Sequence, residues 1–311
     1  MIKEPKVSII IPFYGNQFDC VIAGITSIYD SYHKNLNIIL IDNGSKSNTS
    51  EYVSKIFPKV KLVISEINTG VCGGRNLGID NLNGDEDFVI FFDSDQVVDK
   101  KMISELIKPF SIDSSIGITS PKIYYHPDYI DSKIKSENES DTDLIKRTSL
   151  VWSAGTDINM STGQVIFYGG EDRFNEDRYI SIAPGVLCCS RESLKKIGKF
   201  DIAYVSVYED SDFCFRAKKL GYKIYFCNNA WAWHKIYFDP KGSEKKLLTR
   251  LFFIGRNRIL FMKKFAPNIK LFYLFLPVYV FYYLFISLRN LQLKPFIEFL
   301  KGTYSGLTYE M

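Results

Sequence analysis

The first 90 or so residues alternate short apolar runs with segments whose apolar residues have helical spacing. The apolar runs predict strands at Val7 to Ile11, Asn37 to Ile41, Lys61 to Ile64 and Phe88 to Phe92, and the helical spacing predicts helices at Cys20 to Tyr32 and Gly74 to Leu82. Strands that alternate with helices imply right-handed crossovers and a largely parallel sheet covered on both faces. The first half of the chain is therefore predicted to be α/β, in the style of nucleotide-binding domains.

The pattern changes in the second half. Alternating apolar residues and glycines from Trp152 to Gly170 predict short antiparallel strands. Helical spacing returns at Arg191 to Gly198 and at Ser211 to Leu220, and Lys223 to Cys227 predicts another strand. The segment from His126 to Arg147 is polar, charged and without periodicity, so we expect a flexible excursion there.

Residues 241–311 differ in composition and are predicted to form a basic and aromatic helical region. Lys241 to Lys270 contains nine Lys or Arg and one Glu, whereas Leu271 to Leu288 contains no charged residue and includes Pro277. The uncharged run is long enough to span a bilayer, and its Tyr and Phe also suit the membrane interface. Three interpretations stay open: a spanning helix, an in-plane or hairpin contact with an anionic membrane surface, and a helix buried in the core or in an oligomer.

Composition narrows the class of protein. The 311 residues are 46% hydrophobic and 24% charged, which suits a globular chain, and the net charge of +4 gives no reason to expect nucleic acid. The six cysteines form no C-x-x-C pair, so neither a zinc site nor a disulfide framework is predicted, and a reducing compartment fits best. The N-terminus has no secretory signal pattern, so we expect the catalytic part to stay in the cytosol.

Polar and glycine-rich residues follow each predicted strand of the first half. These clusters are Tyr14-Gly-Asn16, Asp42-Asn-Gly44, Asn68-Thr-Gly70 and Asp93-Ser-Asp95. In parallel sheets ligands bind beyond the carboxyl ends of the strands. Residues two apart on an extended segment point the same way, so Asp93 and Asp95 are predicted to converge on one cation. Carboxylate oxygens suit Mg²⁺ or Mn²⁺ bound to a diphosphate, and an exposed turn is the alternative.

Several further motifs follow in a fixed order along the chain. They are Asn68 to Gly78 (NTGVCGGRNLG), Trp152-Ser-Ala-Gly155, Pro184-Gly-Val-Leu187, Gly198-Lys-Phe-Asp201, Tyr208-Glu-Asp-Ser-Asp212, Trp231-Ala-Trp-His234 and Arg256-Asn-Arg-Ile-Leu260. With these motifs the chain resembles the family 2 glycosyltransferases with the GT-A fold, particularly the rhamnosyltransferase-like branch that builds cell-surface polysaccharides. The resemblance runs from Val7 to about Phe265 and is specific to family and fold, not to the sugar. It implies a catalytic domain at 1–240, with a nucleotide-sugar half at 1–120 and an acceptor half at 121–240.

The resemblance implies a set of donor-binding residues. Those of the base pocket are Pro12, Tyr14 and Asp42, and those along the ribose and diphosphate are Asn68, Gly70, Arg75, Asn76 and Asp93. Glycine permits close approach of a backbone to phosphate, and an arginine supplies a fixed positive charge. For Arg75 the alternative is a surface arginine beside a strand-to-helix turn.

The resemblance also implies metal ligands and a base. Asp95 resembles the direct ligand of Mn²⁺ or Mg²⁺, with Asp93 on the ribose or a metal-bound water and His234 completing the coordination; the alternative for His234 is a packed residue. Asp210 is implied to be the general base, and Glu209 to hold the acceptor or the local structure. The alternative for this acidic pair is a helix N-terminus, where negative charge is favourable.

Taken together, the residues and the resemblance predict a metal-dependent, inverting glycosyltransferase. It is expected to move a sugar from a UDP- or dTDP-sugar to a hydroxyl acceptor, a glycan or lipid-linked glycan, at the cytosolic face of a membrane. The Q-x-x-R-W motif of processive members is absent, so limited sugar addition is expected. Two rivals stay open: a sugar nucleotidyltransferase, although Val7 to Tyr14 lacks its glycine-rich loop, and a catalytically silent nucleotide-sugar-binding or membrane-scaffold protein. An oligomer also stays open.

Overall fold

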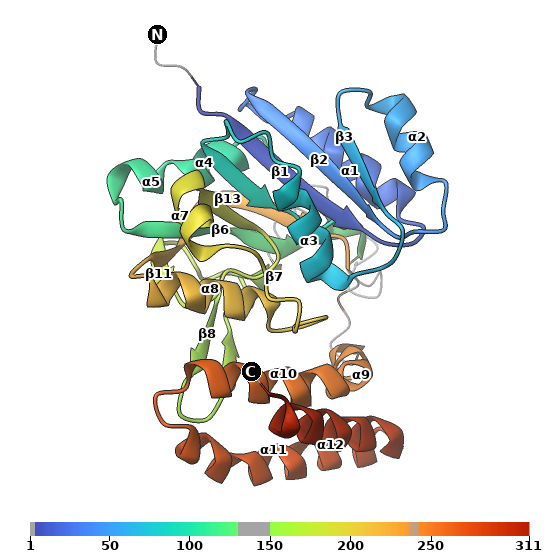
Figure 1. The fold of residues 1–311 in the computed structure, drawn as a ribbon, viewed down its shortest axis with the longest axis vertical. Helices are drawn as coiled ribbons and strands as arrows, with labels where there is room; N and C mark the ends of the chain where they lie inside the picture. Colours follow the sequence, from blue (N-terminus) through green and yellow to red (C-terminus); the bar gives the residue numbers. More distant parts are fainter. Residues whose placement is uncertain (1–3, 130–149, 237, 239–241, 311) are drawn as a thin grey trace, which may run out of the picture.

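The structure is a computed structural model that describes residues 4–129, 150–236, 238 and 242–310. Figure 1 shows an α/β body with the C-terminal helices as a separate layer along one end of it. Most of the predicted flexible excursion from His126 to Arg147 lies outside the described residues. Its described start forms a short 3₁₀ turn, Pro127–Tyr129.

The first half alternates strands and helices as predicted. Its elements are β1 (Val7–Phe13), α1 (Phe18–Tyr29), β2 (Leu36–Asn43), α2 (Thr49–Ile56), β3 (Lys61–Ser65), α3 (Gly70–Asp80), β4 (Phe88–Phe91), β5 (Gln96–Val98), α4 (Met102–Ile107), α5 (Pro109–Ile112) and β6 (Ile116–Tyr125). β1 pairs in parallel with β2 and β4, and β3 pairs in parallel with β2. All four predicted strands and both predicted helices of this half are confirmed.

The second half turns the parallel sheet into a mixed one. Its elements are β7 (Leu150–Ser153), β8 (Thr156–Asn159), β9 (Gln164–Phe167), β10 (Gly170–Glu171), β11 (Arg178–Ile180), β12 (Leu187–Ser190), α7 (Arg191–Ile197), α8 (Glu209–Lys219) and β13 (Lys223–His234). β12 runs antiparallel between β4 and β6, β7 runs antiparallel to β6, and β13 lies parallel to β6. The parallel arrangement predicted for the first half therefore holds for β1 to β4, and the whole sheet is mixed, because β12 enters antiparallel between β4 and β6.

Each face of the sheet has its own apolar layer. On β1, Ile9 and Ile11 pack in the layer under α1 and α4, and Ile10 packs on the opposite side, as strand alternation requires. The second layer also contains Phe213 of α8 and Phe261 of α10. The C-terminal region thus packs in the same core as the sheet.

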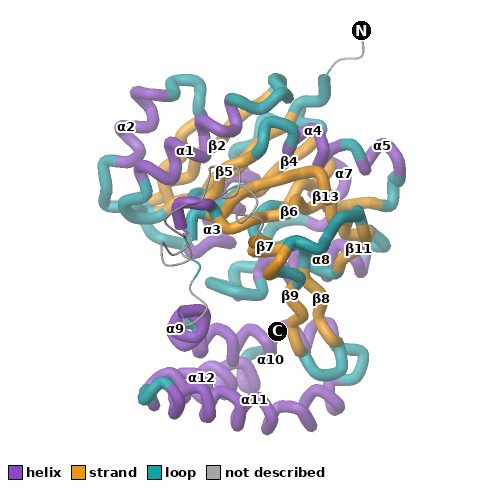
Figure 2. The backbone as a smooth tube through the Cα atoms, turned by 180° about the vertical axis from the view of Figure 1, so that it is seen from behind, coloured by secondary structure: helices purple, strands orange, loops and turns teal. Residues whose placement is uncertain are grey.

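The last residues form the helices α9 (Gly242–Thr249), α10 (Leu251–Phe265), α11 (Ile269–Arg289) and α12 (Leu293–Thr308). α10 and α12 cross closely: a Cβ added at Gly302 would lie 2.0 Å from the carbonyl oxygen of Phe252. The β8–β9 hairpin reaches this helical layer in both views (Figures 1 and 2), and the Tyr279 hydroxyl of α11 donates to the Thr162 carbonyl at 3.0 Å. Among the helices that the structure describes, α11 is the one whose length and composition would let it cross a membrane.

Candidate active site

The two carboxylates predicted to bind a metal, Asp93 and Asp95, follow the apolar strand β4 at the carboxyl edge of the sheet. The chain leaves β4 at Phe91 and bends into a turn at Ser94 and Asp95. The two side chains have different partners: Asp93 Oδ1 accepts from Arg75 Nη2 at 3.1 Å, and Asp95 Oδ1 lies 3.0 Å from His234 Nε2. Asp93 and Asp95 both line the cleft, each with a protein partner of its own, and their convergence on one cation stays a prediction.

Asp95 and His234 form the pair that could hold a divalent cation. His234 ends β13, lies with its ring edge-on to Trp152 at 4.6 Å between centroids, and leaves Nδ1 buried without a hydrogen-bond partner. Within the described ranges no three His, Cys, Asp or Glu side chains are grouped closely enough to hold an ion by themselves. Two protein ligands nevertheless fit Mg²⁺ or Mn²⁺, which complete their coordination with water and substrate phosphates.

A buried arginine links the two acidic parts of the site. Arg75 of α3 is 1% exposed, lies over the ring of Phe200 and donates from Nη1 to Asp210 Oδ1 at 2.5 Å as well as to Asp93. Desolvation raises the pKa of Asp93 to about 6, with Arg75 lowering it and Asp95 raising it. Arg75 therefore compensates charge within the protein instead of lying free for a diphosphate.

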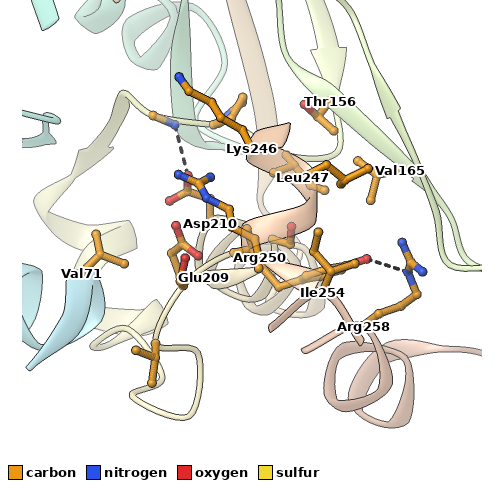
Figure 3. Close-up of a pocket in the computed structure, with 18 of the residues that line it drawn as sticks. Val71, Thr156, Val165, Glu209, Asp210, Lys246, Leu247, Arg250, Ile254 and Arg258 are labelled. Atoms are coloured by element: carbon orange, nitrogen blue, oxygen red, sulfur yellow. Dashed lines mark hydrogen bonds between the residues drawn. The ribbon is translucent and has the colours of Figure 1, made fainter. Parts of the chain in front are cut away.

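The predicted base stands at the start of α8. Asp210 Oδ2 accepts from the backbone N–H of Gly185 at 3.1 Å, so each of its oxygens holds one donor. Glu209 keeps Oε2 buried without a partner, and its pKa is raised by desolvation first and by the charge of Asp210 second. Figure 3 shows both carboxylates at the wall of one cleft. An acceptor hydroxyl could reach Asp210 there.

The loop before Glu209 has unfavourable backbone angles. Val207 and Tyr208 adopt positive φ of 56° and 71°, a region that residues with a Cβ seldom occupy and that a β-branched residue adopts at the highest cost. Both residues line the cleft. Such a conformation persists only where its surroundings impose it.

The motif Arg256-Asn-Arg258 of α10 imposes this conformation. Its contacts with the loop are Arg256 Nη1 to Ala203 O at 2.7 Å, Asn257 Nδ2 to Ser206 O at 2.7 Å and to Val207 O at 2.9 Å, and Arg258 Nε to Tyr208 Oη at 3.2 Å. Sequence reasoning identified the motif but gave it no role. Because α10 lies about fifty residues beyond the loop, spacing alone could not reveal the contact.

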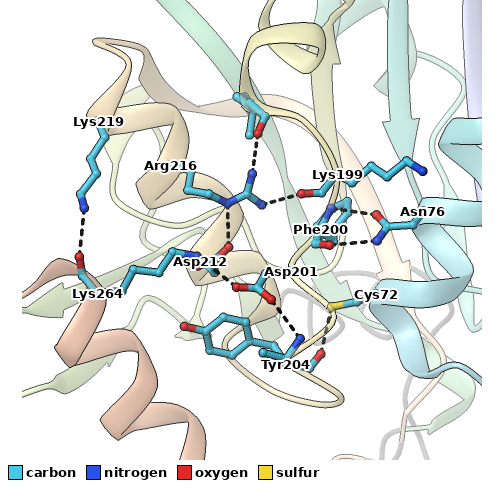
Figure 4. Close-up of polar contacts among 12 residues, drawn as sticks. Cys72, Asn76, Lys199, Phe200, Asp201, Tyr204, Asp212, Arg216, Lys219 and Lys264 are labelled. Atoms are coloured by element: carbon cyan, nitrogen blue, oxygen red, sulfur yellow. Dashed lines mark hydrogen bonds and ion pairs between the residues drawn. The ribbon is translucent and has the colours of Figure 1, made fainter. Parts of the chain in front are cut away.

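A second polar network fixes the rest of α8. Asp212 is fully buried and pairs with Arg216 Nε at 2.8 Å and with Lys264 Nζ of α10 at 2.6 Å (Figure 4). Asn76 lies in the same view, with its amide donating to Phe200 O and accepting from Phe200 N. These contacts hold α3 and α8 in place on either side of the acidic site.

The predicted donor residues divide into two groups. Those that line the cleft together with Glu209, Asp210 and His234 are Pro12, Tyr14, Asn68, Gly70, Asp93 and Asp95. The structure does not bring Asp42, Arg75 and Asn76 to the cleft wall. Asp42 is 3% exposed and accepts from the Ser45 backbone N–H at 2.7 Å and from the Ser50 hydroxyl. These three side chains contact other residues of the chain, and a role in binding the donor stays a prediction for them.

The cleft has a volume of about 1440 Å³ and extends from the strand ends to the C-terminal helices. Its far wall was not predicted and consists of Lys246, Leu247, Arg250, Ile254, Arg258, Phe275, Val278, Tyr279, Tyr282 and Tyr283. The signal in the sequence was the basic stretch followed by the aromatic run. Both features indicate a membrane contact, and nothing in their spacing indicates that they line the cleft.

The chain is similar in sequence to known glycosyltransferases. The family model "Glycosyl transferase family 2" matches residues 8–170. An uncharacterized glycosyltransferase of Rickettsia felis is 37% identical over 110 residues, covering 35% of this chain and 18% of that protein. The amylovoran biosynthesis glycosyltransferase AmsB of Erwinia amylovora is 25% identical over 229 residues, covering 71% and 67%. The chain spans less than half of the length of the first curated relatives that it matches.

Two solved structures share the fold. GalNAc-T7 with UDP, GalNAc and Mn²⁺ superposes with a TM-score of 0.59 at 16% identity, covering 81% of this chain and 48% of that one. The mannosyltransferase PcManGT from Pyrobaculum calidifontis, in complex with GDP-Man and Mn²⁺, gives 0.56 at 14% identity, covering 100% and 77%. The fold is thus GT-A-like, as the sequence predicted. The family model covers more than half of the chain, and the chain belongs to glycosyltransferase family 2.

Proposed function

We propose that the chain is a metal-dependent, inverting glycosyltransferase that transfers a sugar from a nucleotide diphosphate-sugar to a hydroxyl acceptor. One observation carries the proposal: a single cleft joins the Asp95–His234 pair to the carboxylate of Asp210. One cleft therefore contains both a pair that could bind the metal and diphosphate and a carboxylate that could take the proton of the acceptor. Arg75 and the Gly185 N–H hold the Asp210 carboxylate in place at the cleft, which supports its role as a positioned base.

In the proposed reaction an acceptor oxygen attacks the anomeric carbon while the bond from that carbon to the diphosphate breaks. The diphosphate leaves with the bonding electron pair, and Asp210 takes the proton of the acceptor hydroxyl. Attack opposite to the leaving group inverts the anomeric centre in one displacement. Asp95 and His234 would hold Mn²⁺ or Mg²⁺, whose positive charge stabilises the departing diphosphate. Arg75 holds Asp210 and Asp93 in fixed positions.

Similar proteins support the choice of cofactor, donor and acceptor in this proposal. Both solved neighbours were obtained with a nucleotide and Mn²⁺, which supports the same cofactor here. The names of AmsB and of the succinoglycan biosynthesis protein ExoW point to polysaccharide assembly, in keeping with a rhamnosyltransferase-like enzyme that uses a UDP- or dTDP-sugar. A lipid-linked glycan is the acceptor we favour.

We also propose that the enzyme attaches to the cytosolic face of a membrane through α11 and α12. Each helix exposes apolar residues at alternating intervals of four and three: Leu274, Val278, Phe281, Phe285 and Leu288 on α11, and Leu293, Ile297, Leu300, Tyr304 and Leu307 on α12. The opposite side of α11 is packed, with Phe272 and Ile286 buried. A helix packed on one side and apolar on the other suits an in-plane contact. Four basic residues against one acidic residue in 269–308 favour an anionic surface.

The membrane contact is tested by sedimentation with phosphatidylglycerol vesicles. We expect the protein to sediment with them and the double variant Phe281→Glu, Phe285→Glu to stay in solution, because two charges would have to enter the apolar interface. Ile112→Glu, at an exposed position on α5, is the matched control and should still sediment. Wild-type protein that remains in the supernatant at low salt would show that the stripes pair with another protein surface, a second copy being the first candidate.

The transferase activity is tested by incubating the purified protein with a panel of nucleotide sugars, with Mn²⁺ or with a chelator. We expect Mn²⁺-dependent release of nucleoside diphosphate from one donor and a product whose anomeric configuration is inverted. Glycan and lipid-linked glycan acceptors then define the second substrate. Absence of release with every donor and acceptor, together with tight donor binding, would favour the silent binding protein instead.

A further inference from the structure

Three cations line the part of the cleft formed by α9 and α10. Lys246 and Arg250 are exposed, and neither side chain makes a hydrogen bond or ion pair with the portion of the chain that the structure describes. Arg250, Ile254 and Arg258 follow one another at intervals of four residues, so they share one side of α10. Figure 3 shows Lys246, Arg250, Ile254 and Arg258 on the C-terminal helices, which carry neither Glu209 nor Asp210.

Arg258 is a buried cation without a counter-ion. Only 7% of the residue is exposed, and no carboxylate among the described residues pairs with it. Its partners are tyrosines: Nε donates to Tyr208 at 3.2 Å, Nη2 donates to Tyr283 at 3.0 Å, and the guanidinium lies 3.9 Å from the ring centroid of Tyr279. Nη1 is buried and has no hydrogen-bond partner. A buried unpaired charge is costly, so this wall favours an anionic ligand.

The chemistry of this wall selects among anions. Guanidinium groups match the geometry of phosphate oxygens and bind them with charge-assisted hydrogen bonds. Aromatic and apolar residues of α11, namely Phe275, Val278, Tyr279 and Tyr282, line the cleft beside the cations. Val278 also belongs to the exposed apolar stripe of α11. A continuous surface therefore leads from the cations, along α11, to the face proposed to contact the membrane.

We propose that this wall is the binding site for the phosphate group of a phosphate-linked lipid acceptor, whose apolar chain follows α11 toward the membrane and whose sugar hydroxyl faces Asp210. The inference rests on the proposed function and specifies its acceptor. The diphosphate of the donor is assigned to the Asp95–His234 pair, so the two phosphate-binding regions lie on different elements of the same cleft.

The test measures binding instead of turnover, because the transferred sugar is not identified. Calorimetric titrations use farnesyl diphosphate, farnesol and inorganic diphosphate as probes, each in the presence of saturating UDP and Mn²⁺. The variant is Lys246→Gln with Arg250→Gln, two exposed side chains without partners whose replacement should leave thermal unfolding unchanged. Arg191→Gln, an exposed arginine at the start of α7 outside the cleft, is the matched control.

We expect the wild type to bind farnesyl diphosphate at least about tenfold more tightly than farnesol or inorganic diphosphate, since charge and chain each contribute. The double variant should lose at least about tenfold for farnesyl diphosphate and less than about twofold for UDP with Mn²⁺, because two charge-assisted contacts are removed from one site only. The control should change neither affinity.

Three results would overturn the inference. If the double variant loses UDP affinity and farnesyl diphosphate competes with UDP, the cations belong to the donor diphosphate. If farnesol binds as tightly as its diphosphate, the wall recognises only the apolar chain. If dihexanoyl phosphatidylglycerol displaces farnesyl diphosphate at equal concentration, the wall is a bilayer headgroup site. Failure of the proposed function is distinguishable, because no donor would then release nucleoside diphosphate, whereas selectivity for farnesyl diphosphate over farnesol would persist.

Discussion

Replacing Asp210 by Asn tests the proposed base directly. The structure indicates that this change should also lower the stability of the fold. Two donors point at Asp210, the Arg75 guanidinium at Oδ1 and the Gly185 N–H at Oδ2. An asparagine offers one oxygen and one NH₂ group, so one of these donors loses its acceptor. An unmet buried donor costs about 1–3 kcal/mol, and we expect the free energy of unfolding to fall by that amount.

The effect of Asp210→Asn on catalysis should be larger than its effect on stability. Loss of a general base lowers the rate by roughly 10²- to 10⁴-fold, which corresponds to about 2.7–5.4 kcal/mol of transition-state stabilisation. Donor affinity in Mn²⁺ should change little, because the Asp95–His234 pair is untouched. The assay is release of nucleoside diphosphate at saturating donor and acceptor, at a temperature where thermal unfolding shows the variant to be folded.

Glu209→Gln is the matched control for Asp210→Asn. Glu209 adjoins Asp210 and lines the same cleft, but its Oε2 has no hydrogen-bond partner to lose. We expect its kcat to stay within about tenfold of the wild type, because a residue that takes no proton does not cause the loss of roughly 10²-fold or more that follows removal of a general base. The reasoning is refuted if Asp210→Asn retains kcat within tenfold while Glu209→Gln loses 10²-fold or so, because Glu209 would then be the base.

Three further predictions follow from the same geometry. Asp95→Ala or His234→Ala should abolish transfer and weaken Mn²⁺-dependent donor binding, measured by titration with and without Mn²⁺; donor affinity equal to that of the wild type would exclude the pair as ligands. Metal-free wild type should lose unfolding free energy relative to Asp93→Asn as pH rises from 4 to 7, by at most about 3 kcal/mol. The reason is that the pKa of Asp93 is about 6 in the folded state and about 3.8 in the unfolded chain, so the folded state keeps the proton over that range. Denaturant unfolding that gives wild type and Asp93→Asn the same dependence of stability on pH would contradict this. Asn257→Ala should lower kcat without changing donor affinity and reduce stability by about 1–3 kcal/mol, since two loop carbonyls lose their donor; an unchanged kcat would show that the loop keeps its shape unaided.

The sequence predicted the strands whose apolar residues are uninterrupted and missed those that contain turn-forming residues. β6 contains Gly117 and Pro121, which resemble turn signals, although both lie in one continuous strand. β13 was predicted to stop at Cys227, but it continues to His234 after a register shift at Asn228 and its neighbours. In both strands, hydrogen bonding to neighbouring strands of the sheet outweighed the local preference of the sequence for a turn.

The residues at the strand ends were predicted more reliably than the directions of their side chains. Asp93 was placed at the carboxyl edge correctly, but its partner Arg75 lies 18 residues away along the chain, and Asp210, the other partner of Arg75, lies 135 residues from Arg75. The resemblance implied that Arg75 lies along the ribose and diphosphate of the donor, and its ion pairs with Asp93 and with Asp210 of α8 could not be read from the sequence. Long-range ion pairs of this kind have no periodic signature in a sequence.

The C-terminal helices contact the active site on one side and expose the apolar residues proposed to bind the membrane on the other. α10 holds the strained loop before Glu209 through Asn257, and α11 supplies a wall of the cleft with Tyr279 and Tyr282 while exposing Phe281 and Phe285 on its apolar surface. Because Phe261 and the start of α11 also pack in the core under the sheet, attachment at that surface would hold the whole catalytic body at a fixed orientation. An acceptor confined to the membrane would then reach Asp210 by diffusion in two dimensions, with its phosphate bound at the wall that contains Lys246, Arg250 and Arg258. The region that looked like a membrane tail in the sequence is thus a structural part of the proposed acceptor site.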